Sequence, residues 1–216
     1  MTTMKYTLTD LNKLKNVFRK DEIKSIESFL YQYIEKKKIV VYVPLKYVDK
    51  LTYDMGHADA GIIGNYDLCS FRMKGLGTFR PNQKSNPYSG KKNQLSFEEE
   101  VRLEMECNEI DLDKVIDAML NSHPYEEVAY EVYDFTKRTK TQTGFIINLR
   151  RKMNINTLVS RIKKDIDFKI ADINFNFKKI AITNRQITNT VIEKALINNC
   201  EFILSNHNNI FNIKKI

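Results

Sequence analysis

The amino-acid sequence predicts an α+β protein, in which a ferredoxin-like module with a long β-hairpin is flanked by N-terminal helices and a small C-terminal α/β unit. Hydrophobic patterns between residues 39 and 134 follow the order strand, helix, long hairpin, strand, helix, strand, which is the split β-α-β plan. Residues 1–38 contain 9 Lys and Arg against 5 Asp and Glu, residues 39–135 contain 10 against 17, and residues 136–216 contain 16 against 5. This charge asymmetry favours domain boundaries near residues 38 and 135.

The composition suits a globular protein. Of the 216 residues, 42% are hydrophobic, which is enough for a core, and no apolar run reaches the roughly 18 residues of a membrane span. The first residues lack the layout of a signal peptide, so we expect a cytoplasmic protein without membrane contact. Cys69, Cys107 and Cys200 are odd in number and far apart, which favours free thiols over disulfides or a zinc site.

The first 38 residues have helical periodicity. Thr9 and Asp10 can cap a short helix, and a second helix is expected to begin at Asp21 and end at three lysines, 36–38. Its apolar stripe recurs every three or four residues and consists of Ile23, Ile26, Phe29, Leu30, Tyr33 and Ile34.

The central module begins with a buried strand at 39–43, which Pro44 ends, and continues with a helix at 45–55. Residues 66–74 alternate, and we expect Cys69, Phe71 and Met73 to face the core. The segment Gly75-Leu-Gly77 is expected to form the hairpin turn. A half-solvated strand at 97–107, a helix at 111–122 and a strand from Val128 complete the module.

The last 80 residues form a second α/β unit. Strands are expected at 144–149, 168–173, 179–183 and 202–204, and helices at 156–162 and 191–196. This order suggests parallel pairing with right-handed crossovers. Basic clusters at 137–138, 150–152, 161–164 and 178–179 could contact phosphates, but a solvated basic face explains them more simply.

Two groups of residues in the module are candidates for a site. In the first group, His123, Tyr125, Glu126 and Glu127 follow one another after the second helix, and imidazole with carboxylates can bind a metal. The alternative is that His-Pro fixes a turn, and adjacent glutamates on a strand would face opposite sides. The second group lies on the hairpin and could bind a small ligand or an anion, or make subunit contacts; it consists of Asn65, Asp67, Ser70 and Arg72.

The module resembles the inserted domain of the YqfO / NIF-three family, whose members are dinuclear-metal hexamers often described as type 2 GTP cyclohydrolase homologues. The segments that carry this resemblance are Val40-Val-Tyr-Val-Pro44, Gly61-Ile-Ile-Gly-Asn-Tyr-Asp-Leu-Cys-Ser-Phe-Arg72, Gly75-Leu-Gly-Thr-Phe-Arg-Pro81 and His123-Pro-Tyr-Glu-Glu-Val-Ala-Tyr130. The resemblance implies a CutA/PII-like module that forms trimers. Leu68 departs from the pattern, since the family usually has histidine there.

Residues 143–211 resemble a degenerate copy of the C-terminal half of that family, and its N-terminal half, with its metal-binding histidines and aspartate, has no counterpart here. The three histidines of the chain are not paired at metal-ligand spacing. Because a two-metal site needs several converging carboxylates and imidazoles, we predict that the family's dinuclear site cannot form and that no metal cofactor is bound.

The sequence therefore predicts a non-catalytic oligomeric binding or regulatory protein, a trimer or a multiple of three, with an unknown small ligand or protein partner. One alternative is a metal protein or metal-dependent hydrolase with a site at subunit interfaces, built from Asp67, His123, Glu126 and Glu127. A weaker alternative is nucleic-acid binding through the basic C-terminal unit.

Overall fold

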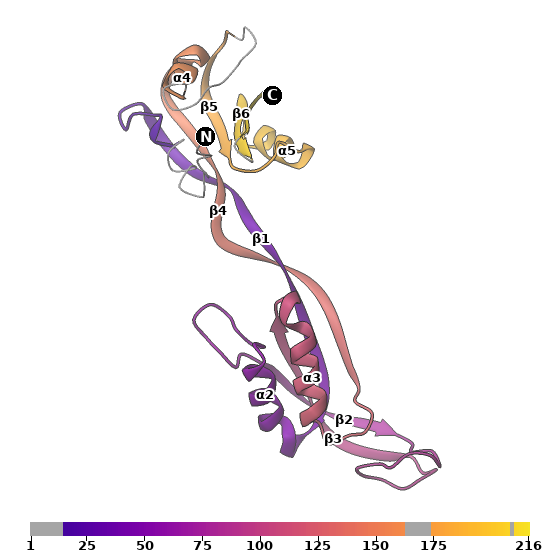
Figure 1. Ribbon diagram of the computed structural model, residues 1–216. Helices are drawn as coiled ribbons and strands as arrows, with labels where there is room; N and C mark the ends of the chain where they lie inside the picture. Colours follow the sequence, from indigo (N-terminus) through magenta and orange to yellow (C-terminus); the bar gives the residue numbers. More distant parts are fainter. Residues whose placement is uncertain (1–14, 163–173, 208–209) are drawn as a thin grey trace, which may run out of the picture. The chain divides into compact units, whose positions relative to one another are not determined.

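The structure is a computed structural model that describes residues 15–162, 174–207 and 210–216. The chain divides into two compact units (Figure 1). We call Tyr33–Lys137 the ferredoxin-like unit, and Met1–Gln32 together with Arg138–Ile216 the basic unit. Strands β1 (Ile23–Pro44) and β4 (Tyr130–Asn154) contribute residues to both. None of the helices among the described residues has the length and apolar character needed to cross a bilayer.

The ferredoxin-like unit has the strand order that the sequence predicts. Its sheet runs β2-β3-β1-β4, where β2 is Phe71–Phe79 and β3 is Ser96–Cys107. Strand β3 pairs antiparallel with both β1 and β2. The α-helices α2 (Val48–His57) and α3 (Leu112–Ser122) pack on one face, each entered through a short 3-10 turn, at Leu45–Tyr47 and Glu109–Asp111. This is the order of a split β-α-β fold, which confirms the predicted class.

The two faces of this sheet differ sharply. From Val101 onward, every second residue of β3, such as Val101 and Leu103, is buried beneath α2 and α3. The residues between them, including Glu100, point to the opposite face, which we call the open face. Because Val41 is buried with Leu103, its neighbour Tyr42 belongs to the open face as well.

The basic unit contains the order β1-β4-β5-β6-β7. Strand β5 (Asn176–Thr183) is parallel to β6 (Phe202–His207), as the strand–helix–strand pattern predicts. It is antiparallel to β4, in contrast to the parallel pairing expected for this unit. Strand β7 (Ile210–Lys215), which the sequence did not reveal, is antiparallel to β6. The strand predicted at 168–173 lies outside the described residues.

Helices cover both faces of this second sheet, which explains its continuous apolar strands. Ile180 and Ile182 pack with α4 (Ile155–Ile162), whereas Ala181, between them, packs with α5 (Asn189–Ile197). Since successive side chains on a strand point to opposite faces, a sheet that is buried on both faces needs no polar alternation.

The helix predicted at 21–38 is wrong, because Ile23–Pro44 is one strand of 22 residues. Phe29 and Leu30, which are adjacent, are both buried. The apolar residues at spacings of three and four are therefore buried by packing within a sheet and not along one face of a helix. Isoleucines and aromatic residues favour a strand once such partners are present, and the pairing overrides the helical pattern. Residues 15 and 16 are helical, and the residues before them lie outside the described part.

The hairpin turn predicted at Gly75–Gly77 is also wrong. Both glycines lie inside β2, and residues 80–95 connect β2 to β3. Register places Phe71 and Met73 opposite Glu104 and Arg102, on the open face, where they are 59% and 52% exposed. They do not face the core as expected, because Arg72 and Lys74 take the positions on the helix-covered side.

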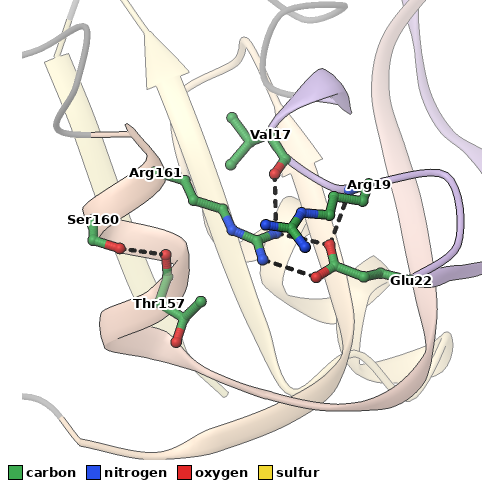
Figure 2. Close-up of polar contacts among 6 residues, drawn as sticks. All are labelled: Val17, Arg19, Glu22, Thr157, Ser160 and Arg161. Carbon is green, nitrogen blue, oxygen red and sulfur yellow. Dashed lines mark hydrogen bonds and ion pairs between the residues drawn. The ribbon is translucent and has the colours of Figure 1, made fainter.

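An ion pair fastens the start of β1 to helix α4 in the basic unit (Figure 2). The Arg161 guanidinium donates to both carboxylate oxygens of Glu22, at 2.7 and 2.8 Å, and to the Val17 carbonyl at 3.2 Å. The Arg19 backbone N–H donates to the same carboxylate at 2.9 Å. The hydrogen bond from Arg161 lowers the pKa of Glu22 from 4.5 to about 2, although burial opposes it.

Candidate functional site

A cavity of about 460 Å3 lies in the ferredoxin-like unit, beside the His123-Pro-Tyr-Glu-Glu segment. Its wall combines Gly77 and Phe79 of β2, the connecting segment that includes Tyr88, and the turn before β4. Glu100 of β3 and Tyr42 of β1 complete it from the open face of the sheet. The size is that of a small-molecule pocket, which is typically about 300–1,000 Å3.

His123 fixes this turn rather than lining the cavity. It is the C-cap of α3 and adopts an extended backbone, as residues before proline prefer. Its Nε2 lies 2.9 Å from the Tyr42 carbonyl, and its Nδ1 accepts the Tyr125 backbone N–H at 3.2 Å. The hydrogen-bond network therefore assigns the proton to Nε2. Burial lowers the pKa of His123, and the bond to Tyr42 opposes this only in part, so the imidazole is held neutral.

Tyr125 carries the turn into the cavity wall. Its ring lies 4.9 Å from the His123 ring and 5.7 Å from the Tyr88 ring. Its hydroxyl donates to Glu100 Oε1 at 2.9 Å. Burial and the adjacent Glu100 carboxylate raise the pKa of Tyr125, so the phenol stays protonated and keeps donating.

Gly77 makes room for the Glu100 carboxylate. A Cβ on Gly77 would lie 2.1 Å from Glu100 Oε2, far inside contact distance. The same Cβ on Gly75, two residues earlier in β2, would meet nothing within 4 Å. The two glycines therefore have different roles, and only Gly77 shapes the wall.

Glu126 and Glu127 both line the cavity, which corrects the expectation that they face opposite sides. Strand β4 begins only at Tyr130, so the alternation of a strand does not apply to them. Glu126 accepts the Asn86 backbone N–H with both oxygens, at 2.8 and 3.0 Å, and thereby ties the turn to the connecting segment.

The chain is similar to known proteins in sequence and in structure. No family model matches the chain. Over 137 residues, or 63% of its length, it is 39% identical to a GTP cyclohydrolase 1 type 2 homolog of Halalkalibacterium halodurans, and over 152 residues it is 34% identical to that of Bacillus subtilis. A Bacillus cereus crystal structure described as related to NIF3 matches 92% of the chain with a TM-score of 0.52 and 30% identity. The chain is thus similar to NIF3-related proteins in both sequence and fold.

The match covers only part of each relative. The chain spans 37% and 40% of the two curated relatives and 52% of the crystallised Bacillus cereus chain. A Staphylococcus aureus crystal structure with a TM-score of 0.55 and 15% identity supports the fold alone. This similarity therefore does not by itself transfer the activity of those longer proteins.

The described residues do not fit the dinuclear metal centre that the family resemblance implies. Among them, no three His, Cys, Asp or Glu side chains gather as a cation site. His123 has both ring nitrogens within hydrogen-bond distance of backbone atoms, which leaves no lone pair directed at a metal. No chemical step through a metal follows from this geometry.

The second candidate group on the hairpin does not join the cavity. Arg72 instead donates to Asp49 at 2.6 Å and to Thr52 at 2.8 Å, both on α2. Asn65, Asp67 and Ser70 are exposed in the turn-rich segment before β2. Leu68, the position that departs from the family, has φ 51°, and its Cδ2 fills the space beside Gly56.

A hollow of about 580 Å3 in the basic unit gathers several basic side chains. The pairing of β4 with β5 shifts register between Asn148 and Met153, and the residues of this irregularity include Arg150, Arg151 and Lys152, which line the hollow. Arg161 also lines it, but Glu22 neutralises its charge as shown in Figure 2.

Sequence reasoning missed most of the cavity wall and found only Tyr125, Glu126 and Glu127. Tyr42 and Glu100 read as ordinary members of alternating strands, and Tyr88 lies in a polar loop. Gly77 read as a turn former. These residues come together with Tyr125 only when the strands pair and the connecting segment folds back. In the sequence, the one sign of the site was the set of glutamates that recur at alternating positions of β3.

Proposed function

We propose that the chain is a non-catalytic, self-associating binding protein of the NIF3-related family, which has lost the dinuclear metal centre and holds a small ligand in the cavity of its ferredoxin-like unit. The observation that carries this proposal is the structural role of the segment from His123 to Glu127, which holds a turn and forms part of a cavity wall. Its imidazole is neutral, buried and bonded to backbone on both sides, whereas its neighbours form a cavity wall.

The same contacts argue against a hydrolase at this segment. A general base must reach the proton that it removes, and a metal ligand must offer a lone pair. His123 offers neither, and Glu126 already accepts a backbone N–H with both oxygens. Asp67, the fourth residue of the hypothetical interface site, lies in the segment before β2 and outside the cavity wall.

Self-association is supported by apolar side chains on the open face. Phe71 and Met73 are both more than half exposed there, and they lie on β2, the edge strand of the sheet. Exposed apolar patches and sheet edges are common association surfaces. A trimer or a multiple of three remains a prediction, as does the cytoplasmic location.

Metal analysis tests the loss of the dinuclear centre. The full chain, purified without a histidine tag and without chelator, is analysed by inductively coupled plasma mass spectrometry. We expect well under one ion of zinc, iron, manganese or nickel per chain. About two tightly held ions per chain would overturn this part of the proposal and favour the metal-dependent alternative.

Nucleic-acid binding is a second candidate, favoured by the basic unit. That unit contains 21 Lys and Arg against 9 Asp and Glu, and its hollow gathers three basic side chains at one irregularity. Retention on immobilised DNA that disappears at moderate salt would favour this candidate, because phosphate contacts weaken steeply with ionic strength.

A further inference from the structure

The geometry points to an organic cation, a protonated or quaternary amine, as the class of ligand that the cavity of the ferredoxin-like unit takes. This inference rests on the proposed binding function and deepens it. It is carried by the two kinds of group in the wall, aromatic faces and carboxylates.

Aromatic rings enter the wall from four separate segments. They belong to Tyr42, Phe79, Tyr88 and Tyr125. The negative face of an aromatic ring attracts cations, and several rings around one space form the kind of cage that binds quaternary amines. Lys46 shows the effect locally, since its Nζ lies 5.0 Å from the centroid of the Tyr88 ring.

Carboxylates outnumber cations in the same wall. The wall contains the carboxylates of Glu100, Glu126 and Glu127 and a single cationic group, the guanidinium of Arg80. Beyond the wall, Glu98 accepts from the Ser89 hydroxyl at 2.7 Å and adds negative charge, while Lys46 opposes it. This excess of negative charge repels an anionic ligand and attracts a cationic one.

One carboxylate is held in place before any ligand arrives. The Tyr125 hydroxyl occupies Glu100 Oε1, and Gly77 leaves the space that Oε2 takes. A carboxylate has about four lone-pair sites, so one hydrogen bond leaves Glu100 able to accept from an ammonium group or to neutralise its charge. The high pKa of Tyr125 keeps this arrangement intact across neutral pH.

Choline and its neutral isostere 3,3-dimethyl-1-butanol test the inference on the full chain. The two probes share shape and differ in the charge of one atom. In 15N NMR titrations we expect choline to shift the amides of Asn86 and Tyr125 with a dissociation constant on the order of 1 mM, as suits so small a fragment. The neutral probe should bind about tenfold more weakly.

Matched variants assign the effect to the wall. Glu100→Gln should weaken choline about tenfold, because it removes charge but keeps the hydrogen bond from Tyr125. Glu99→Gln makes the same change on the neighbouring position of β3, outside the wall, and should leave choline unchanged. Gly77→Ala, which displaces the Glu100 carboxylate, should weaken choline, whereas Gly75→Ala should not.

The outcomes separate the two levels of the proposal. Equal binding of both probes at these amides would overturn the cationic class and leave a binding cavity. If neither probe shifts these amides at 50 mM, both the class and the cavity as a binding site fail. Equal losses in Glu99→Gln and Glu100→Gln would also contradict the inference, since they would indicate a general effect of charge.

Discussion

At the scale of single residues, the most instructive case is Glu22. In the sequence it marks the start of a helix that does not exist, but in the structure it anchors the start of a strand to Arg161. The bidentate geometry explains why a charge near an element end matters here although most surface ion pairs contribute little.

We expect Glu22→Gln to reduce the free energy of unfolding by about 1–2 kcal/mol at pH 7, after allowance for solvent screening. Because the folded pKa of Glu22, about 2, lies below its ordinary value of 4.5, the contribution is complete above about pH 4.5 and is lost as the pH falls toward 2. Urea unfolding followed by circular dichroism should show the gap between variant and wild type closing over that range.

Glu193→Gln is the control for this experiment, since Glu193 is exposed on α5 and lines no cavity described above. It should leave stability nearly unchanged at every pH. A gap for Glu22→Gln that is the same at pH 7 and pH 2.5 would contradict the pKa assignment.

Site residues could be predicted from the sequence where they are adjacent in the chain. The segment from His123 to Glu127 stood out, and it does border the cavity. The expected facing of Glu126 and Glu127 was wrong because β4 begins at Tyr130, two residues after the predicted start at Val128, so neither glutamate lies on the strand. Tyr88 and Glu100 could not be predicted, since their roles depend on where a long connecting segment folds back.

At the scale of elements, the helices were predictable and the strands less so. Helices α2, α3, α4 and α5 lie where apolar spacing and capping residues place them. Most of strand β1 was missed because its apolar residues recur at the spacing of a helix, and only pairing with neighbouring strands overrides that pattern. The lysines at 36–38, read as a helix end, instead meet carboxylates of neighbouring segments, as the pair Lys38–Glu104 illustrates.

The cap of α5 offers an independent check of an element. Thr188 adopts an extended backbone, and its hydroxyl accepts the Val191 N–H at 3.4 Å. We expect Thr188→Ala to cost about 1 kcal/mol in urea unfolding, because a helix N–H loses its partner. Thr188→Ser keeps the acceptor and should stay within a few tenths of a kcal/mol of wild type. Equal losses in the two variants would mean that the methyl group, not the cap, is what matters.

At the scale of the whole molecule, charge and apolar surface are distributed unevenly. The ferredoxin-like unit contains 14 Lys and Arg against 18 Asp and Glu, whereas the basic unit has an excess of 12 positive charges. Like charges of that density resist association of two basic units. Copies of the chain should therefore meet through the weakly charged unit, where Phe71 and Met73 are exposed.

We expect light scattering after size exclusion to give three times the 25.4 kDa chain mass, or a multiple of it, for the wild type. Phe71→Ser combined with Met73→Ser should shift the protein to the mass of one chain, because it removes the apolar patch at the edge strand without touching the buried core. Ile110→Ser is the matched control, since Ile110 is an apolar residue that is 90% exposed in the 3-10 turn before α3 and does not belong to β2. A monomeric wild type, or equal dissociation by the control variant, would show that the open face is not the surface that joins the copies.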